Sequence, residues 1–155
     1  MRRRLTGAAA AAADAGLSWE QVAVVECTAN DPDAGARAAA GLLVGPDAPT
    51  AVFACSDQLA LGVLRAARTA GIRVPDELSV VGFDDSPSAL VAEPPLTTVA
   101  QPLRERGQAV GALVRALLRG EEVSSPAVSP VQLVLRSSTG QAPNGSQRRT
   151  VPRTR

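Results

Sequence analysis

Short, almost continuous apolar runs recur along the first half of the chain and alternate with longer segments of helical spacing. Residues 22–27, 51–56 and 78–83 consist mostly of apolar residues that favour strands, as strands covered on both faces do. Between them, residues 31–44 and 57–70 are rich in Ala and Leu at helical spacing. The alternation of strand and helix predicts an α/β fold with a doubly wound parallel sheet.

Capping and turn residues separate these segments consistently. Gly16 and Gly71 each end a helical run and precede an apolar residue, a pattern typical of helix C-termini. Ser56 and Ser86 stand directly after predicted strands, where a hydroxyl can cap the next helix, and Pro87 occupies a favoured first helical position. We therefore expect helices to begin immediately at the ends of strands.

The second half of the chain carries one long helical pattern. Within residues 102–120, apolar or small side chains recur on a single helical face, namely Leu103, Gly107, Val110, Gly111, Val114, Leu117 and Leu118. Such a face requires a partner surface. Residues 131–136 alternate enough to form a further strand, whereas residues 141–155 are polar and Arg-rich and are expected to be disordered.

Composition favours a soluble globular domain of ordinary size, with 45% hydrophobic and 20% charged residues. The net charge of +1 and the lack of a basic helical face predict that this segment does not bind nucleic acid. No stretch reaches the roughly 20 apolar residues of a membrane span, and the first residues lack a signal-peptide pattern. We expect a cytoplasmic protein without membrane contact.

Polar side chains follow each of the first three predicted strands, at the edge where an open parallel sheet binds ligands. They are Glu26, Thr28 and Asn30, then Ser56 and Asp57, then Asp84, Asp85 and Ser86. Carboxylates and amides suit a polyhydroxyl ligand. Helix capping accounts better for Asp57, Asp85 and Ser86, whereas Asp84 lacks an evident local partner and is expected to face a ligand.

An enzyme is the alternative class, because an acidic pair at a strand end can hold Mg²⁺. The sequence contains neither His nor Lys, which removes the usual phosphoryl-contacting Lys, a Ser/His/Asp triad and a Walker A loop. Glycoside hydrolysis needs a second carboxylate, and nothing places one opposite Asp84. We therefore predict no enzymatic activity, no metal site and no cofactor.

Four segments together resemble the effector-binding half of the lactose/galactose repressor family. Residues 49–87 (PTAVFACSDQLALGVLRAARTAGIRVPDELSVVGFDDSP) carry most of the likeness, followed by residues 94–102 (PPLTTVAQP) and 106–120 (RGQAVGALVRALLRG). Residues 3–17 (RRLTGAAAAAADAGL) are similar to the family's Arg-x-x-Gly helix. The resemblance extends from about residue 4 to about residue 140.

The resemblance implies a periplasmic-binding-protein-like type I sensor domain, with a sugar or nucleoside held between two lobes. Residues 1–140 would form an incomplete sensor domain. Residues 1–101 and 127–139 would belong to its C-terminal lobe, and the helix within 102–120 to the N-terminal lobe. In the family, effector binding changes the affinity for operator DNA, through a helix-turn-helix headpiece that this sequence lacks, and the full-length regulators form homodimers.

Site residues can be transferred from the family position by position. Arg4 and Asp84 match its ligand-contacting Arg and Asp, and Ser56 stands where many members have Asn, so that one hydroxyl replaces an amide. Asn30 matches a position that often carries an aromatic residue for sugar stacking. Gln101 falls on the crossover between the lobes and is either a hinge residue or a ligand contact.

Two alternatives to a regulator stay open. The sugar-binding protein of a transporter shares the fold, although residues 74–87 (VPDELSVVGFDDSP) look more like the repressor branch. The second alternative is that the chain is a truncated remnant without function of its own.

Overall fold

The computed structural model describes residues 2–123 and 130–142. In chain order the elements are α1 (Arg2–Asp14), η1 (Trp19–Gln21), α2 (Pro32–Leu42), β1 (Ala51–Phe53), α3 (Asp57–Thr69), β2 (Ser79–Asp84), α4 (Pro87–Leu90), β3 (Thr97–Ala100), α5 (Leu103–Leu118) and β4 (Gln132–Val134). The predicted disordered tail, residues 141–155, lies outside the described residues from 143 onward, as do residues 127–129 of the predicted C-terminal lobe.

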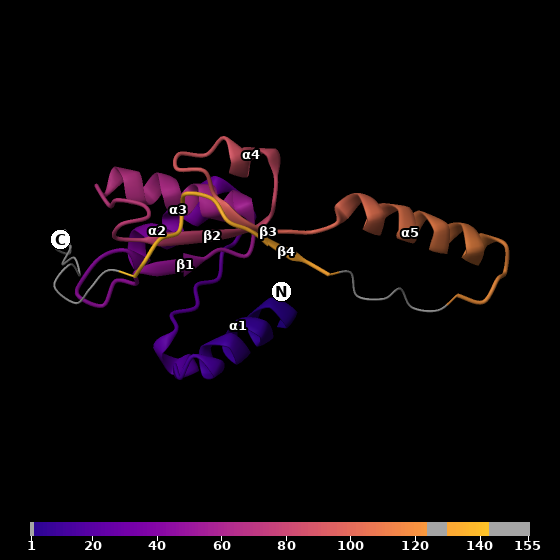
Figure 1. Ribbon diagram of the computed structural model, residues 1–155, viewed down its shortest axis with the longest axis horizontal. Coiled ribbons are helices and arrows are strands. Elements are labelled where there is room, and N and C mark those ends of the chain that lie inside the picture. Colours follow the sequence, from indigo (N-terminus) through magenta and orange to yellow (C-terminus); the bar gives the residue numbers. More distant parts are fainter. Residues whose placement is uncertain (1, 124–129, 143–155) are drawn as a thin grey trace.

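A four-stranded sheet in the order β1-β2-β3-β4 forms the centre of the fold (Figure 1). Strands β1, β2 and β3 are parallel, with Val52 opposite Val80 and Phe83 opposite Val99. Strand β4 runs antiparallel to β3, and Leu133 pairs with Val99. The predicted α/β class is therefore confirmed, with an antiparallel strand at one edge of an otherwise parallel sheet.

Helices lie on both faces of this sheet. An added Cβ at Gly82 would meet Asp57 and Ala60, so this face of β2 packs on α3. The neighbouring Phe83 points to the opposite face, because side chains alternate along a strand, and there it contacts Arg4 of α1. Figure 1 shows the same arrangement, with α2 and α3 on one side of the sheet and α1 on the other.

The predicted strand at residues 22–27 is wrong. This segment takes no place in the sheet, whose β1 edge is unpaired among the described residues. Val24 and Val25 are consequently 49% and 46% exposed. An apolar run indicates an extended backbone, but a strand also needs a neighbour that supplies hydrogen bonds along its edge.

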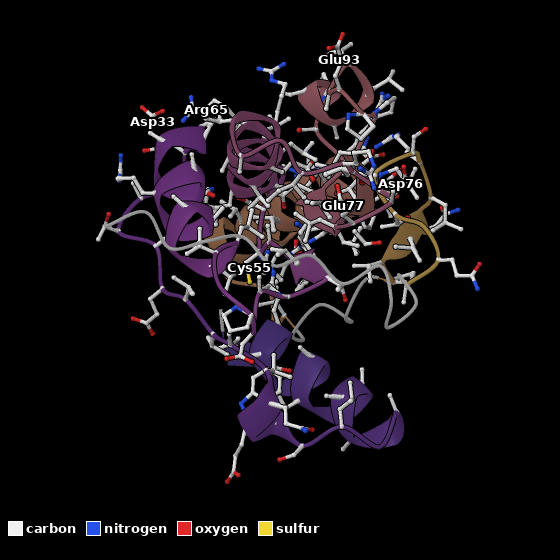
Figure 2. All side chains as sticks on the ribbon, turned by 90° about the vertical axis from the view of Figure 1, so that its left-hand side faces the viewer. Asp33, Cys55, Arg65, Asp76, Glu77 and Glu93 are labelled. Carbon is white, nitrogen blue, oxygen red and sulfur yellow. The ribbon has the colours of Figure 1, made fainter. Side chains whose placement is uncertain are left out.

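The core lies between the sheet and the helix pair α2 and α3. Its largest fully buried apolar side chains are Leu43, Leu78, Val80 and Leu96. The two helices approach so closely that added Cβ atoms at Gly35 and Gly62 would collide with the backbone of the other helix. Outside this contact, Arg65 pairs with Asp33 at 2.5 Å and holds the pKa of that carboxyl below its usual range (Figure 2).

Most of the predicted helix ends are confirmed. Gly16 and Gly71 have φ of 74° and 69°, and the amides of Leu17 and Ile72 bond back to the carbonyls of Ala12 and Ala67. Ser56 caps α3 by accepting from the amide of Leu59 at 3.2 Å. Ser86 precedes Pro87 as predicted, yet its side chain makes no capping hydrogen bond.

Helix α5 extends away from the rest of the molecule (Figure 1). It forms where the 3.6-residue period predicts it, but it buries none of its side chains within the described residues. The apolar stripe is open to solvent, with Val110 53%, Leu117 54% and Leu118 83% exposed. Among the described residues, no helix combines the length and the apolar character needed to cross a membrane.

Candidate functional site

The carboxyl ends of β1, β2 and β3 bring most of the predicted site residues to one edge of the sheet. Ser56 follows β1, Asp84 ends β2 and Gln101 directly follows β3. Arg4 reaches this edge from α1, and Asn30 reaches it from the loop before α2. Hydrogen bonds join Ser56 to Asn30 and Asp84 to Gln101. Arg4 instead contacts the neighbouring residues Cys55 and Phe83.

Ser56 is 4% exposed and has little capacity left for a ligand. Its hydroxyl donates to Oδ1 of Asn30 and accepts from the amide of Leu59. The Asn30 side chain is exposed, and its carboxamide nitrogen is not consumed by this bond. The donor that this sequence offers at the end of β1 is therefore the amide of Asn30, held by Ser56.

Arg4 is fixed at the same edge by two contacts. Its Nη1 donates to the carbonyl oxygen of Cys55 at 2.6 Å. The guanidinium carbon lies 3.9 Å from the centroid of the Phe83 ring, a cation–π geometry. Figure 2 places Cys55 at the junction of the sheet and α1. The remaining N–H groups of the Arg4 guanidinium thus lie near the strand ends, and stacking on Phe83 sets the orientation of the guanidinium plane.

Asp84 has a partner that the sequence did not indicate. Its Oδ1 accepts a hydrogen bond of 2.7 Å from Nε2 of Gln101. The Oε1 of Gln101 accepts in turn from Nη1 of Arg106, one turn into α5. The three side chains connect the end of β2 to the helix that follows the crossover. Oδ2 of Asp84 has no contact in this set.

Two largely buried contacts hold the turn after β2 in place. The sequence pattern indicated helix capping for Asp57 and Asp85 and did not identify Arg136. Asp57 is 1% exposed and accepts from the amide of Ser86 at 2.6 Å. Asp85 pairs with Arg136 at 2.6 Å, and both side chains are largely covered. Arg136 ends the predicted strand 131–136. A charged residue at the end of an apolar run was the one sequence feature that could have indicated an ion pair with Asp85.

A hollow of about 480 Å³ opens elsewhere on the molecule, on the outer side of α2 and α3. Its lining includes Ala36, Ala40 and Ala66 together with Arg37 and Arg65. None of the predicted site residues lines it. It is separate from the edge of the sheet described above.

The chemistry available at the strand ends is that of hydrogen-bonded recognition. It combines a carboxylate at Asp84, a guanidinium at Arg4 and amides at Asn30 and Gln101. Within residues 2–123 and 130–142, no group of three or more His, Cys, Asp and Glu side chains is placed to hold a metal ion. Donors and acceptors of this kind match the hydroxyl groups of a small polar ligand.

Comparison with known proteins identifies the family. The periplasmic binding protein-like domain family matches residues 1–139. The chain belongs to this family. The transcriptional regulator DegA of Bacillus subtilis is 39% identical over 139 residues, which cover 89% of this chain and 41% of DegA. The chain therefore spans about two fifths of the length of this relative.

Solved structures agree with the sequence comparison. The transcriptional regulator CelR in complex with cellobiose superposes with a TM-score of 0.76 at 37% identity, over 87% of this chain and 41% of CelR. The lac repressor dimer bound to operator gives 0.63 at 35% identity, over 70% of this chain and 38% of the repressor. The predicted likeness to the C-terminal part of lactose/galactose repressors is confirmed, and these relatives are regulators rather than enzymes.

The serines that precede α3 and α4 should differ in what they contribute to stability. Ser56→Ala removes a formed cap and should lower the free energy of unfolding by about 1 kcal/mol. Ser86→Ala is the matched control, because its Oγ is buried and has no hydrogen-bond partner among the described residues. Its removal should leave stability unchanged or slightly raised. Urea unfolding followed by circular dichroism measures both; equal losses would contradict this assignment.

Proposed function

We propose that this chain is the effector-sensing part of a transcriptional regulator and binds a sugar at the carboxyl ends of β1 and β2. The observation that carries the proposal is the convergence there of Asp84, Arg4 and Asn30, one acceptor and two donors from three different parts of the chain. A polyhydroxyl ligand needs this mixture. The cellobiose bound to the similar CelR supports a sugar rather than another polar molecule.

Each residue has a distinct part in this proposal. Oδ2 of Asp84, which makes no hydrogen bond within the described part of the chain, accepts from ligand hydroxyls, and Arg4 and Asn30 donate to ligand oxygens. Ser56 acts through Asn30, whose carboxamide it orients. Gln101 bonds to Asp84 in the structure, and a ligand that takes over this carboxylate would release Gln101 and Arg106.

The surroundings of the site fit a larger regulator. We propose that the exposed stripe of α5 packs in the whole protein against a second lobe, which closes the site from above, and that a separate headpiece contacts operator DNA. The proposal draws on the share of DegA that this chain covers and on the lac repressor dimer bound to operator. A homodimer in the cytoplasm, where operator DNA is found, follows from the same reasoning, and no enzymatic activity is required.

Asp84→Asn should weaken sugar binding about tenfold, because it removes the charge from an ionic hydrogen bond. Binding is measured by two-dimensional amide NMR of the labelled chain, titrated with cellobiose, sucrose and uridine. We expect a sugar to shift the amides of Arg4, Asn30 and Asp84. Asp47→Asn is the control, since it makes the same chemical change at an exposed carboxylate away from the site.

Three outcomes are distinguishable in this titration. Shifts at the strand ends with uridine alone would replace the sugar by a nucleoside. Shifts confined to the hollow on the outer side of α2 and α3 would place the binding site there instead. Absence of any shift with all three compounds at millimolar concentration, in a folded chain, would contradict binding at this edge of the sheet.

A further inference from the structure

The turn that follows β2 has an unfavourable backbone conformation at two consecutive residues. Asp84 and Asp85 have φ of 118° and 56°, values at which the backbone of residues other than glycine is strained. Neither residue is glycine, although Asp tolerates the second of these values better than most. A conformation of this kind persists only where surrounding contacts determine it. Those contacts come from three distant segments of the chain.

Asp57 holds the turn from the side of α3. Its Oδ2 accepts from the amide of Ser86, and its Oδ1 accepts from the hydroxyl of Thr98 at 2.5 Å. The same hydroxyl accepts from the amide of Asp85 at 3.4 Å. Gly82 makes room for this arrangement, since a Cβ there would lie 2.3 Å from Oδ1 of Asp57. The backbone amides of Asp85 and Ser86 therefore both donate to buried side chains.

Arg136 holds the turn from the side of β4. Its Nη2 meets Oδ1 of Asp85 at 2.6 Å, while its Nη1 donates to the carbonyl oxygen of Leu96 at 2.8 Å. Its side chain is 15% exposed, so the pair is shielded from most solvent. The guanidinium fork thereby fixes the Asp85 side chain to the start of β3 and leaves the Asp84 side chain on the ligand edge.

We infer that Arg136 and Asp57 are positioning residues that set the direction of the Asp84 carboxylate toward the ligand. This inference rests on the proposed function and adds to it the device that orients its acceptor. Asp57 anchors the amides, and Arg136 anchors the Asp85 side chain. The two residues act through the turn and need not touch the ligand.

The test compares Arg136→Met with Arg65→Met. Both remove a guanidinium paired to an aspartate and keep a similar side-chain stem, but Arg65 and Asp33 lie on the outer side of α2 and α3. The first readout needs no ligand: a residue at φ near 56° gives a strong cross-peak between its own amide and α protons. Arg136→Met should weaken this cross-peak at Asp85 and shift the amide of Ser86, while Arg65→Met leaves both unchanged.

The second readout is the affinity for cellobiose or sucrose, whichever binds the parent chain. We expect Arg136→Met to weaken it about tenfold, because small misplacement of a binding group is costly. If Arg136→Met fails to fold, Asp85→Asn removes the same ion pair with almost no change of shape and serves in its place. An unchanged Asp85 cross-peak in Arg136→Met overturns the inference whether or not a sugar binds. Failure of the parent chain to bind any sugar contradicts the proposed function and leaves the cross-peak test of the turn in place.

Discussion

Gly62→Ala should lower the free energy of unfolding by about 3 kcal/mol, a large share of the roughly 5 to 15 kcal/mol by which a domain is ordinarily stable. An added Cβ would lie 2.1 Å from the carbonyl oxygen of Pro32 and 2.6 Å from the amide nitrogen of Ala36. Both atoms belong to the backbone of α2, so no side-chain rotation relieves the contact. The helices would have to separate and expose core residues such as Leu43.

Gly41→Ala is the matched control for this prediction. It makes the same substitution in α2, but nothing lies within 4 Å of the new Cβ. Alanine is the better helix former, so this variant should be more stable by about 0.5 to 1 kcal/mol. Urea unfolding followed by far-ultraviolet circular dichroism compares both variants with the parent chain. A Gly62→Ala variant as stable as the parent would contradict the close packing of α2 and α3.

Local patterns predicted the elements of this fold that depend on local interactions. The period of the apolar positions located α3, α5 and β2 to within a few residues. Capping residues such as Ser56 and Gly71 fixed where helices begin and end, because a cap bonds to residues three to five positions away. The likeness to a known family added the overall class, which the comparisons confirmed.

Pairing between distant residues was the part that patterns did not reveal. Residues 22–27 have the apolar character of a strand, but character alone does not provide a hydrogen-bonding neighbour. The site shows the same limit. Asp84 has no evident local partner in the sequence, and the partner that it has, Gln101, lies 17 positions along the chain. The pair of Arg136 and Asp85 spans 51 positions and needs the completed sheet to bring its ends together.

Hydrogen bonds connect the polar turn at Asp84 with the apolar helix α5. The turn at Asp84 is polar and strained, and buried contacts hold it in place. Gln101 and Arg106 extend from it to the first turn of α5. The direction in which α5 leaves the sheet is thus connected to the same carboxylate that we propose for ligand binding. The exposed face of that helix decides how the isolated chain behaves.

The 155-residue chain should self-associate through α5 with a second copy of itself. The stripe exposes five large apolar side chains, Leu103, Val110, Val114, Leu117 and Leu118, each between 49% and 83% open to solvent. Burial contributes about 1.5 to 3 kcal/mol for each such side chain when it is complete. Burial of these side chains on both copies favours association in the micromolar range, which requires about 8 kcal/mol. The stripe lies along one face, as helix pairs require.

Val110→Gln combined with Val114→Gln should convert these associated species to monomers, because it places two amides in the middle of the stripe. Glutamine is a good helix former, so α5 itself is preserved. Ala109→Gln combined with Ala112→Gln is the control, since both positions are exposed and lie away from the stripe. Sedimentation velocity at several concentrations distinguishes the variants. A parent chain that sediments as a monomer up to 100 μM, or a control pair that dissociates equally, would contradict association through this face.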